Sequence, residues 1–185
     1  EYPFIKTAVI GKSVMGKDIP AIRIGRSPEY VLFAGGFHGS EHITSTLLLH
    51  FCEELCYAWR EDRSIEGLNV RKAMYGRGLV ILPCVNPDGC EISRFGFHST
   101  GGSRFLRRIS GGDYSHFNAN ARGVDINHNF NADWKKVFDT PGPTKYGGEY
   151  PESEPETRAV AKLLRTAQPE LFIAFHSQGK EIYYD

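Results

Sequence analysis

Three short apolar runs constrain the fold of this chain more than any other feature of its sequence. They lie in the segments YVLFAGGFH, RGLVILPCVNPDG and LFIAFH, at residues 30–38, 77–89 and 171–176. Each run is continuous rather than alternating, which is typical of strands that are buried on both faces. Buried strands separated by helical segments predict an α/β fold with a mostly parallel sheet.

Two segments between these strands are predicted to be helical. Residues 42–59 repeat apolar side chains at helical spacing, and residues 153–170 open with a candidate capping box. In that box Ser153 is the N-cap and Glu156 follows three residues later.

The remaining segments complete the predicted architecture. Residues 6–14 and 19–27 predict an antiparallel hairpin, and residues 181–185 are a candidate further strand. Residues 91–120 are rich in Gly, Ser, Arg and His and predict a long loop. We therefore expect one domain over residues 1–185, with a mixed, mostly parallel central sheet and helices on both faces.

Charge and hydropathy exclude some classes of partner. The chain has 185 residues with 22 basic and 22 acidic side chains, so its formal net charge is zero and gives no reason to expect nucleic acid as a partner. No apolar run approaches the ~20 residues of a membrane-spanning helix, so membrane insertion is not expected. The first residue is Glu1 rather than Met, which leaves localisation open.

The four cysteines form no zinc or disulfide signature. Cys52 and Cys56 share a helical stripe with apolar residues, which predicts buried thiols that pack as small apolar groups. Cys84 and Cys90 flank the NPDG segment and are close enough in sequence to pair.

Two histidines and a glutamate are the candidate chemical centre. His38 ends the first apolar run, Glu41 follows it in GGFHGSEH, and His176 ends the last run. In open α/β sheets ligands gather beyond the carboxyl ends of strands, so these three side chains can converge. Two imidazoles and one carboxylate are a common set of ligands for one catalytic Zn²⁺ ion. The alternative is that these histidines are structural.

Five motifs in fixed order connect this centre to a known family. FHGSEH is followed by LPCVNPDG, ANARGVDINHNF, PESEPETRA and FHSQG. In these motifs, from about residue 8 to 185, the sequence resembles the zinc carboxypeptidases, or funnelins. The resemblance implies a carboxypeptidase-like fold and zinc-dependent cleavage of a peptide. In the mechanism expected of such a site, the metal polarises the scissile carbonyl and activates a water molecule.

The resemblance also assigns roles to individual residues. It implies that His38, Glu41 and His176 are the zinc ligands and that Asp125 accepts a hydrogen bond from His38, which would orient that ligand. It implies that Asn127 binds the terminal carboxylate of the substrate.

Two departures from the family pattern concern substrate binding. His128 stands where the family usually has an arginine that clamps the substrate carboxylate, and Arg122 is a candidate replacement cation. The NHNF variant resembles a bacterial branch that cuts γ-D-glutamyl-diaminopimelate bonds in peptidoglycan stem peptides. Asn118 stands where relatives often have a cation that polarises the scissile carbonyl. The candidate substitutes for that cation are Arg104, Arg107 and Arg108.

A third departure concerns catalysis. The family's general-base glutamate lies well beyond the third zinc ligand, and no residue of this sequence matches it, so the catalytic base is not identified here. We therefore expect the C-terminal part of a carboxypeptidase fold to be absent from this chain, whether the natural protein is longer or lacks that part. General acid–base catalysis is worth about 10²–10⁴-fold in rate, so the chain alone would be a slow enzyme.

Three functions remain open from the sequence. The first is a zinc peptidase acting on γ-D-glutamyl-diaminopimelate bonds, in a bacterium that exports it or recycles wall fragments in the cytoplasm. The second is a general metallocarboxypeptidase that removes C-terminal residues. The third is a zinc- and peptide-binding module without hydrolytic activity.

Overall fold

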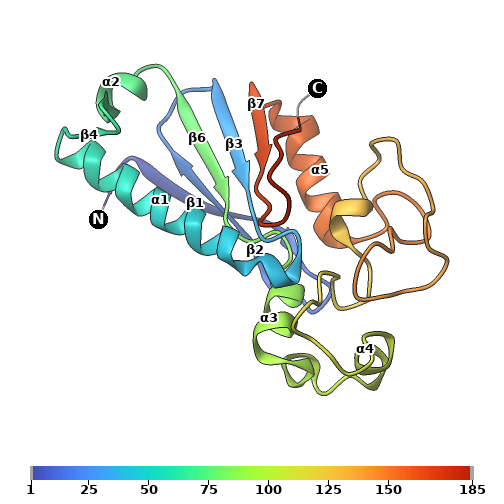
Figure 1. Ribbon diagram of the computed structural model, residues 1–185. Coiled ribbons are helices and arrows are strands. Elements are labelled where there is room, and N and C mark those ends of the chain that lie inside the picture. The colour runs from blue at the N-terminus through green and yellow to red at the C-terminus, as the bar shows by residue number, and fades with distance from the viewer. Residues whose placement is uncertain (1, 184–185) are drawn as a thin grey trace.

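A computed structural model describes residues 2–183 of the chain. The centre of the fold is a five-stranded sheet with the strand order β1-β2-β6-β3-β7 (Figure 1). The strands are β1 (Ile5–Lys12), β2 (Asp18–Ile24), β3 (Tyr30–Ala34), β6 (Gly78–Leu82) and β7 (Leu171–Ala174). β1 pairs with β2, and β2 with β6, in antiparallel orientation, whereas β6, β3 and β7 run parallel. The predicted mixed sheet with an antiparallel start is confirmed.

Helices cover both faces of this sheet (Figure 1). The long helix α1 (His42–Arg60) lies on one face and α5 (Pro155–Ala167) on the other. The smaller elements are η1 (Gly39–Glu41), β4 (Ser64–Ile65), β5 (Leu68–Asn69), α2 (Val70–Ala73), α3 (Pro87–Phe95), η2 (Phe97–Thr100), α4 (Arg104–Ile109) and η3 (Ile126–His128). Among residues 2–183, no helix is long and apolar enough to cross a membrane.

The alternation of side chains along each strand divides the core into two layers. Leu32 and Leu82 pack with Val160 of α5, whereas Leu79 and Ile81 pack with Leu48 of α1. All six side chains are at most 3% exposed. Full burial of one such side chain stabilises the fold by about 1.5–3 kcal/mol, so both helices are held mainly by these contacts.

The predicted thiol burial on α1 is confirmed. Cys52 is 7% exposed and Cys56 is 1% exposed, and both belong to the layer between α1 and the sheet.

The predicted long loop at residues 91–120 is wrong in part. Helix α3 begins at Pro87 and continues to Phe95, so it takes up the first residues of the predicted loop. Helix α4 follows at residues 104–109, with Ser103 as its N-cap. Proline suits the first helical position because its missing N–H would have no intrahelical partner there.

The predicted capping box on α5 is also wrong. The helix begins at Pro155 with Glu154 at the N-cap position, and no side chain caps it. The Ser153 hydroxyl instead donates to the Glu154 carboxylate at 2.9 Å. Proline at residue 155 fixes the first helical φ, so the start of the helix falls two residues after the predicted cap.

The third apolar run forms a strand, but that strand is not buried. In β7 Leu171 is 51% exposed and Ile173 is 36% exposed, because β7 pairs only with β3 in the described part of the chain. The predicted strand at residues 181–185 is not formed at residues 181–183, and residues 184–185 lie outside the described region.

Asn86 connects three segments beneath the carboxyl edge of the sheet. Its side-chain oxygen accepts from the backbone N–H of Gly89 at 2.9 Å and caps α3. Its side-chain nitrogen lies 3.1–3.2 Å from the carbonyl oxygens of Phe37, Asn118 and Ala119. Because Asn86 is fully buried, water cannot replace these hydrogen bonds if they are lost.

We expect Asn86→Ala to reduce the free energy of unfolding by about 3 kcal/mol, since it removes a helix cap and leaves buried carbonyls without a donor. Urea unfolding followed by circular dichroism measures this change. Asn131→Ala is the matched control, because Asn131 is exposed. Equal stability of the two variants would contradict the role of Asn86.

Candidate metal centre

The parallel pairing of β3 and β7 brings the two predicted histidines to one edge of the sheet. Ala34, the last residue of β3, pairs with Ala174, the last residue of β7. His38 lies four residues beyond the first strand and His176 two residues beyond the second. Both therefore lie at the carboxyl edge, where open α/β sheets bind ligands.

Glu41 lies between the two imidazole rings. Its Oε2 atom is 2.9 Å from His176 Nδ1 and 3.2 Å from His38 Nδ1. One ligand atom from each of the three residues lies within 4.8 Å of the others. The structure thus brings together all three predicted zinc ligands.

The loop that holds His38 and Glu41 depends on the absence of a side chain at Gly39. A Cβ atom at this position would lie 2.3 Å from the carbonyl oxygen of Gly89 and 2.4 Å from that of Phe117. The Gly39 N–H donates to the Asn118 carbonyl at 3.1 Å. Glycine therefore lets the loop lie directly against two other backbone segments, which fixes the spacing of His38 and Glu41.

The chemistry of the three side chains fits a zinc ion. Within residues 2–183, neither ring nitrogen of His38 makes a hydrogen bond of good geometry, although both are buried. Buried polar atoms in native proteins almost always have hydrogen-bond or metal partners, so these two nitrogens fit a residue that binds a metal ion. Two imidazole nitrogens and one carboxylate oxygen are a typical protein set for catalytic zinc.

Without a cation, the charges in the centre stabilise a protonated His38. Burial lowers the pKa of His38, but the carboxylates of Asp125 and Glu41 raise it more, to about 9. Burial likewise raises the pKa of Glu41, but His176 and His38 lower it more, to about 2. The metal-free centre is therefore held together by charge pairs that a bound metal would replace.

Asp125 holds His38 from the side opposite Glu41. Its Oδ1 atom lies 3.3 Å from His38 Nε2, whereas Oδ2 accepts from the Lys145 N–H at 2.8 Å. The Asn127 N–H also donates to Oδ1, at 3.2 Å. Because Asp125 is 1% exposed and bound at both oxygens, it can fix the orientation of the His38 ring.

The predicted substrate-binding residues lie close to this carboxylate in sequence. Asn127 and His128 belong to η3, which begins directly after Asp125, and both are exposed. Arg122 is also exposed, but its guanidinium lies 3.5 Å from the buried carboxylate of Glu154. Arg122 therefore already has a counter-charge, whereas Asn127 and His128 are open to solvent.

A contact that the sequence did not predict joins Asn118 to the loop that holds His38 and Glu41, which we call the ligand loop. The Ser40 hydroxyl donates to Asn118 Oδ1 at 2.5 Å, and Ser40 lies between Gly39 and Glu41. Asn118 thus braces the loop directly. The arginines predicted as substitutes for a cation at residue 118 are all exposed on α4: Arg104, Arg107 and Arg108. The guanidinium of Arg107 lies 5.6 Å from the centre of the Phe97 ring.

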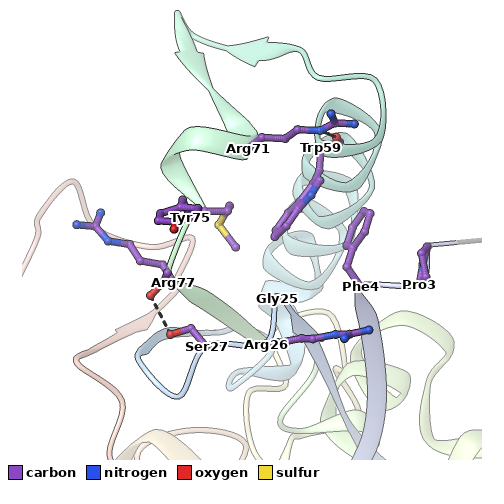
Figure 2. Close-up of a pocket in the computed structure, with 11 residues that line it drawn as sticks. Pro3, Phe4, Gly25, Arg26, Ser27, Trp59, Arg71, Tyr75 and Arg77 are labelled. Atoms are coloured by element: carbon purple, nitrogen blue, oxygen red, sulfur yellow. Dashed lines mark hydrogen bonds between the residues drawn. The ribbon is translucent and has the colours of Figure 1, made fainter.

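A separate cavity of about 500 Å³ lies away from the metal centre (Figure 2). Its wall includes Gly25, which follows β2, and Arg77, which precedes β6, so it lies at the end of the sheet opposite His38. Trp59 lines it and stacks on Phe4 with ring centroids 4.7 Å apart. Open α/β sheets bind their ligands at the carboxyl ends of the strands, so the edge that carries His38, Glu41 and His176 is a better candidate for the functional site than this cavity.

Comparison with known families agrees with this geometry. A sequence model of the zinc carboxypeptidase family matches residues 1–185. Gamma-D-glutamyl-L-diamino acid endopeptidase 1 of Lysinibacillus sphaericus is 33% identical over 190 residues, which cover 99% of this chain and 48% of that protein. Carboxypeptidase A6 of Homo sapiens is 28% identical over 182 residues, or 95% of this chain and 38% of that protein.

Solved structures share the fold. Thrombin activatable fibrinolysis inhibitor superposes with a TM-score of 0.72 at 21% identity, over 96% of this chain and 43% of that one. Murein-tripeptide amidase MpaA from Escherichia coli O157 has a TM-score of 0.52 at 25% identity, and the superposition covers 92% of this chain and 60% of that one. The chain spans about half the length of the first two curated relatives it matches.

We expect Asp125→Asn to weaken zinc binding about 10–100-fold, because the neutral amide loses the charge with which the Asp125 carboxylate attracts and orients the His38 ring. Competition with a chromophoric chelator measures the affinity of the full-length protein. Asp139→Asn serves as the control, since Asp139 is exposed. An affinity unchanged by Asp125→Asn would contradict the orienting role.

Zinc binding is also expected to release a proton near pH 7.5. The pKa of His38 is raised from 6.5 to about 9, so the metal-free centre holds a proton that neutral, zinc-binding imidazole must lose. The stabilisation from this charge is complete below pH ~6.5 and disappears as the pH rises through about 9.

Apparent zinc affinity should therefore increase as the pH rises from about 7 towards 9. Calorimetric titration at pH 7.5 in buffers with different heats of ionisation counts the released protons. Binding heats that do not depend on the buffer would contradict the protonated state of His38.

Proposed function

The chain belongs to the zinc carboxypeptidase family, and from this premise we propose that the full-length protein is a zinc-dependent peptidase. The observation that supports this activity most directly is the convergence of His38, Glu41 and His176 within 4.8 Å at the carboxyl edge of the sheet. These residues would hold one Zn²⁺ ion. When bound, zinc supplies Lewis-acid polarisation of a carbonyl and lowers the pKa of a coordinated water to about 7.

The protein's own residues prepare this centre and its substrate. Asp125 keeps the His38 ring in one orientation through its contact with Nε2. Glu41, at 2% exposure, is shielded from water, so its carboxylate stays in place between the two rings. Asn127 and His128 are exposed and follow Asp125 closely in the chain, and in this proposal their side chains donate hydrogen bonds to a substrate carboxylate.

Within residues 2–183, this proposal assigns no residue as the proton acceptor. The family resemblance places the general-base glutamate further along the chain than His176. Glu181 is the glutamate that follows His176 within residues 2–183. It is not assigned as the base, because it is exposed and accepts a hydrogen bond from Tyr183. In this proposal the described residues supply the metal ligands and the substrate contacts.

For the substrate, we propose the γ-D-glutamyl-diaminopimelate bond of peptidoglycan stem peptides. The relative with 33% identity is named a gamma-D-glutamyl-L-diamino acid endopeptidase, and one structural relative is named a murein-tripeptide amidase. His128 supports the same choice, because an imidazole cannot form the two parallel hydrogen bonds by which arginine clamps a C-terminal carboxylate. A stem peptide instead offers carboxylates at unusual positions.

The full-length, zinc-loaded protein is expected to hydrolyse a γ-D-Glu–diaminopimelate peptide with a higher kcat/KM than ordinary C-terminal peptide substrates. Both substrate sets are assayed side by side, with chelator-treated protein as the blank. Preference for the ordinary set would identify a general metallocarboxypeptidase. Zinc binding without hydrolysis of either set would identify a binding module.

The contribution of His128 can be measured in the same assay. We expect His128→Arg to shift the ratio of the two kcat/KM values at least about 10-fold towards ordinary C-terminal substrates, since charged bidentate hydrogen bonds are roughly twice as strong as neutral ones. His116→Arg is the matched control, because His116 is exposed and lies outside the proposed site. An equal ratio in the two variants would remove His128 from substrate selection.

A further inference from the structure

Two cysteines lie together beneath the loop that holds His38 and Glu41. Cys84 follows β6 and Cys90 lies in the first turns of α3, and their Sγ atoms are 3.6 Å apart. Both residues are partly exposed. In a disulfide the two sulfur atoms lie about 2.05 Å apart, so a shift of about 1.5 Å would join them.

The other two cysteines of the chain lie on one helix, where the backbone disfavours a disulfide. Cys52 and Cys56 are buried and lie one turn apart on α1. Side chains at this spacing have Cβ atoms about 5–6 Å apart, whereas a disulfide needs about 3.5–4.5 Å. They form a natural internal control within the same chain.

The Cys84–Cys90 pair touches the ligand loop through backbone contacts. A Cβ atom at Gly36, whose φ is +64°, would lie 3.2 Å from Cys84 Sγ and 3.1 Å from Cys84 Cα. The Asn86 N–H donates to the Gly36 carbonyl at 2.8 Å, and the Val85 N–H donates to the Gly35 carbonyl at 3.0 Å. The segment between the two cysteines therefore supports the chain just before His38.

We propose that Cys84 and Cys90 are a modification site: a dithiol that small disulfide oxidants convert into an intramolecular disulfide. The Cys84 thiolate attacks one sulfur of the oxidant, which forms a mixed disulfide and releases one thiol. The Cys90 thiolate then attacks Cys84 Sγ and releases the second thiol. The protein loses two protons and two electrons, and the oxidant gains them as two thiols.

The environments of the two sulfurs suit these different roles. The Cys90 thiol lowers the pKa of Cys84 by hydrogen bonding, and Ser45 and the Asn86 backbone lower it further against the effect of burial. The same hydrogen bond raises the pKa of Cys90, and burial raises it further. Cys84 is accordingly the first nucleophile, since the thiolate is the reactive form.

The disulfide closes a short ring from Cys84 to Cys90 and joins the end of β6 to α3. Ring closure of this length restricts the unfolded chain, so it is expected to raise the unfolding temperature by about 3–5 °C. Because α3 packs against the ligand loop at Gly39, the crosslink braces the loop from below.

The test uses the full-length, zinc-loaded protein treated with oxidised glutathione, then alkylated, digested and analysed by mass spectrometry. The expected result is loss of two of the chain's four thiols, a tryptic peptide of residues 78–94 that carries an internal Cys84–Cys90 disulfide, and the higher unfolding temperature. Dithiothreitol should reverse all three. Cys90→Ser should stop at a glutathione adduct on Cys84, without the rise in unfolding temperature.

Three results would overturn the proposal. The first is wild-type protein that keeps both thiols or carries only glutathione adducts. The second is a crosslink between Cys52 and Cys56 in place of the expected one. The third is a rise in unfolding temperature in Cys90→Ser equal to that of the wild type, which would show that the thermal effect does not come from the crosslink.

Discussion

The parallel pairing of β3 with β7 is the constraint on which the metal centre depends. His38 and Glu41 are separated from His176 by more than 130 residues, yet the register of the two strands brings their ends to one edge. A shift of β7 by one residue would turn its side chains to the opposite face of the sheet. Phe172 and Phe175, which are half-buried and pack against the two core layers, oppose such a shift.

Buried polar side chains, rather than regular structure, fix the loops around this centre. Asn86, Asn120 and Asn129 are all fully buried and bind backbone groups or carboxylates far along the chain. Asn120 donates to Glu154 and to Glu156, whose pKa is raised by burial. Each amide satisfies groups that would otherwise lie buried without partners, so these hydrogen bonds hold the irregular segments against one another.

The sequence predicted the sheet and the three converging ligands because both have local signals. Continuous apolar runs mark the strands, and His38 and His176 end two of them. The short helix α4 was missed because glycine, serine and arginine obscure its periodicity. The exposure of β7 and the contact of Ser40 with Asn118 were missed for another reason: neighbour positions and long-range hydrogen bonds leave no periodic pattern in a sequence.

Anomalous diffraction at the zinc absorption edge, from zinc-loaded crystals of the full-length protein, tests the central claim most directly. The account predicts one strong peak with His38 and His176 nitrogens and a Glu41 oxygen about 2.0–2.2 Å away. A peak at other residues, such as the sulfurs of Cys84 and Cys90, or no peak near the three side chains, would contradict it.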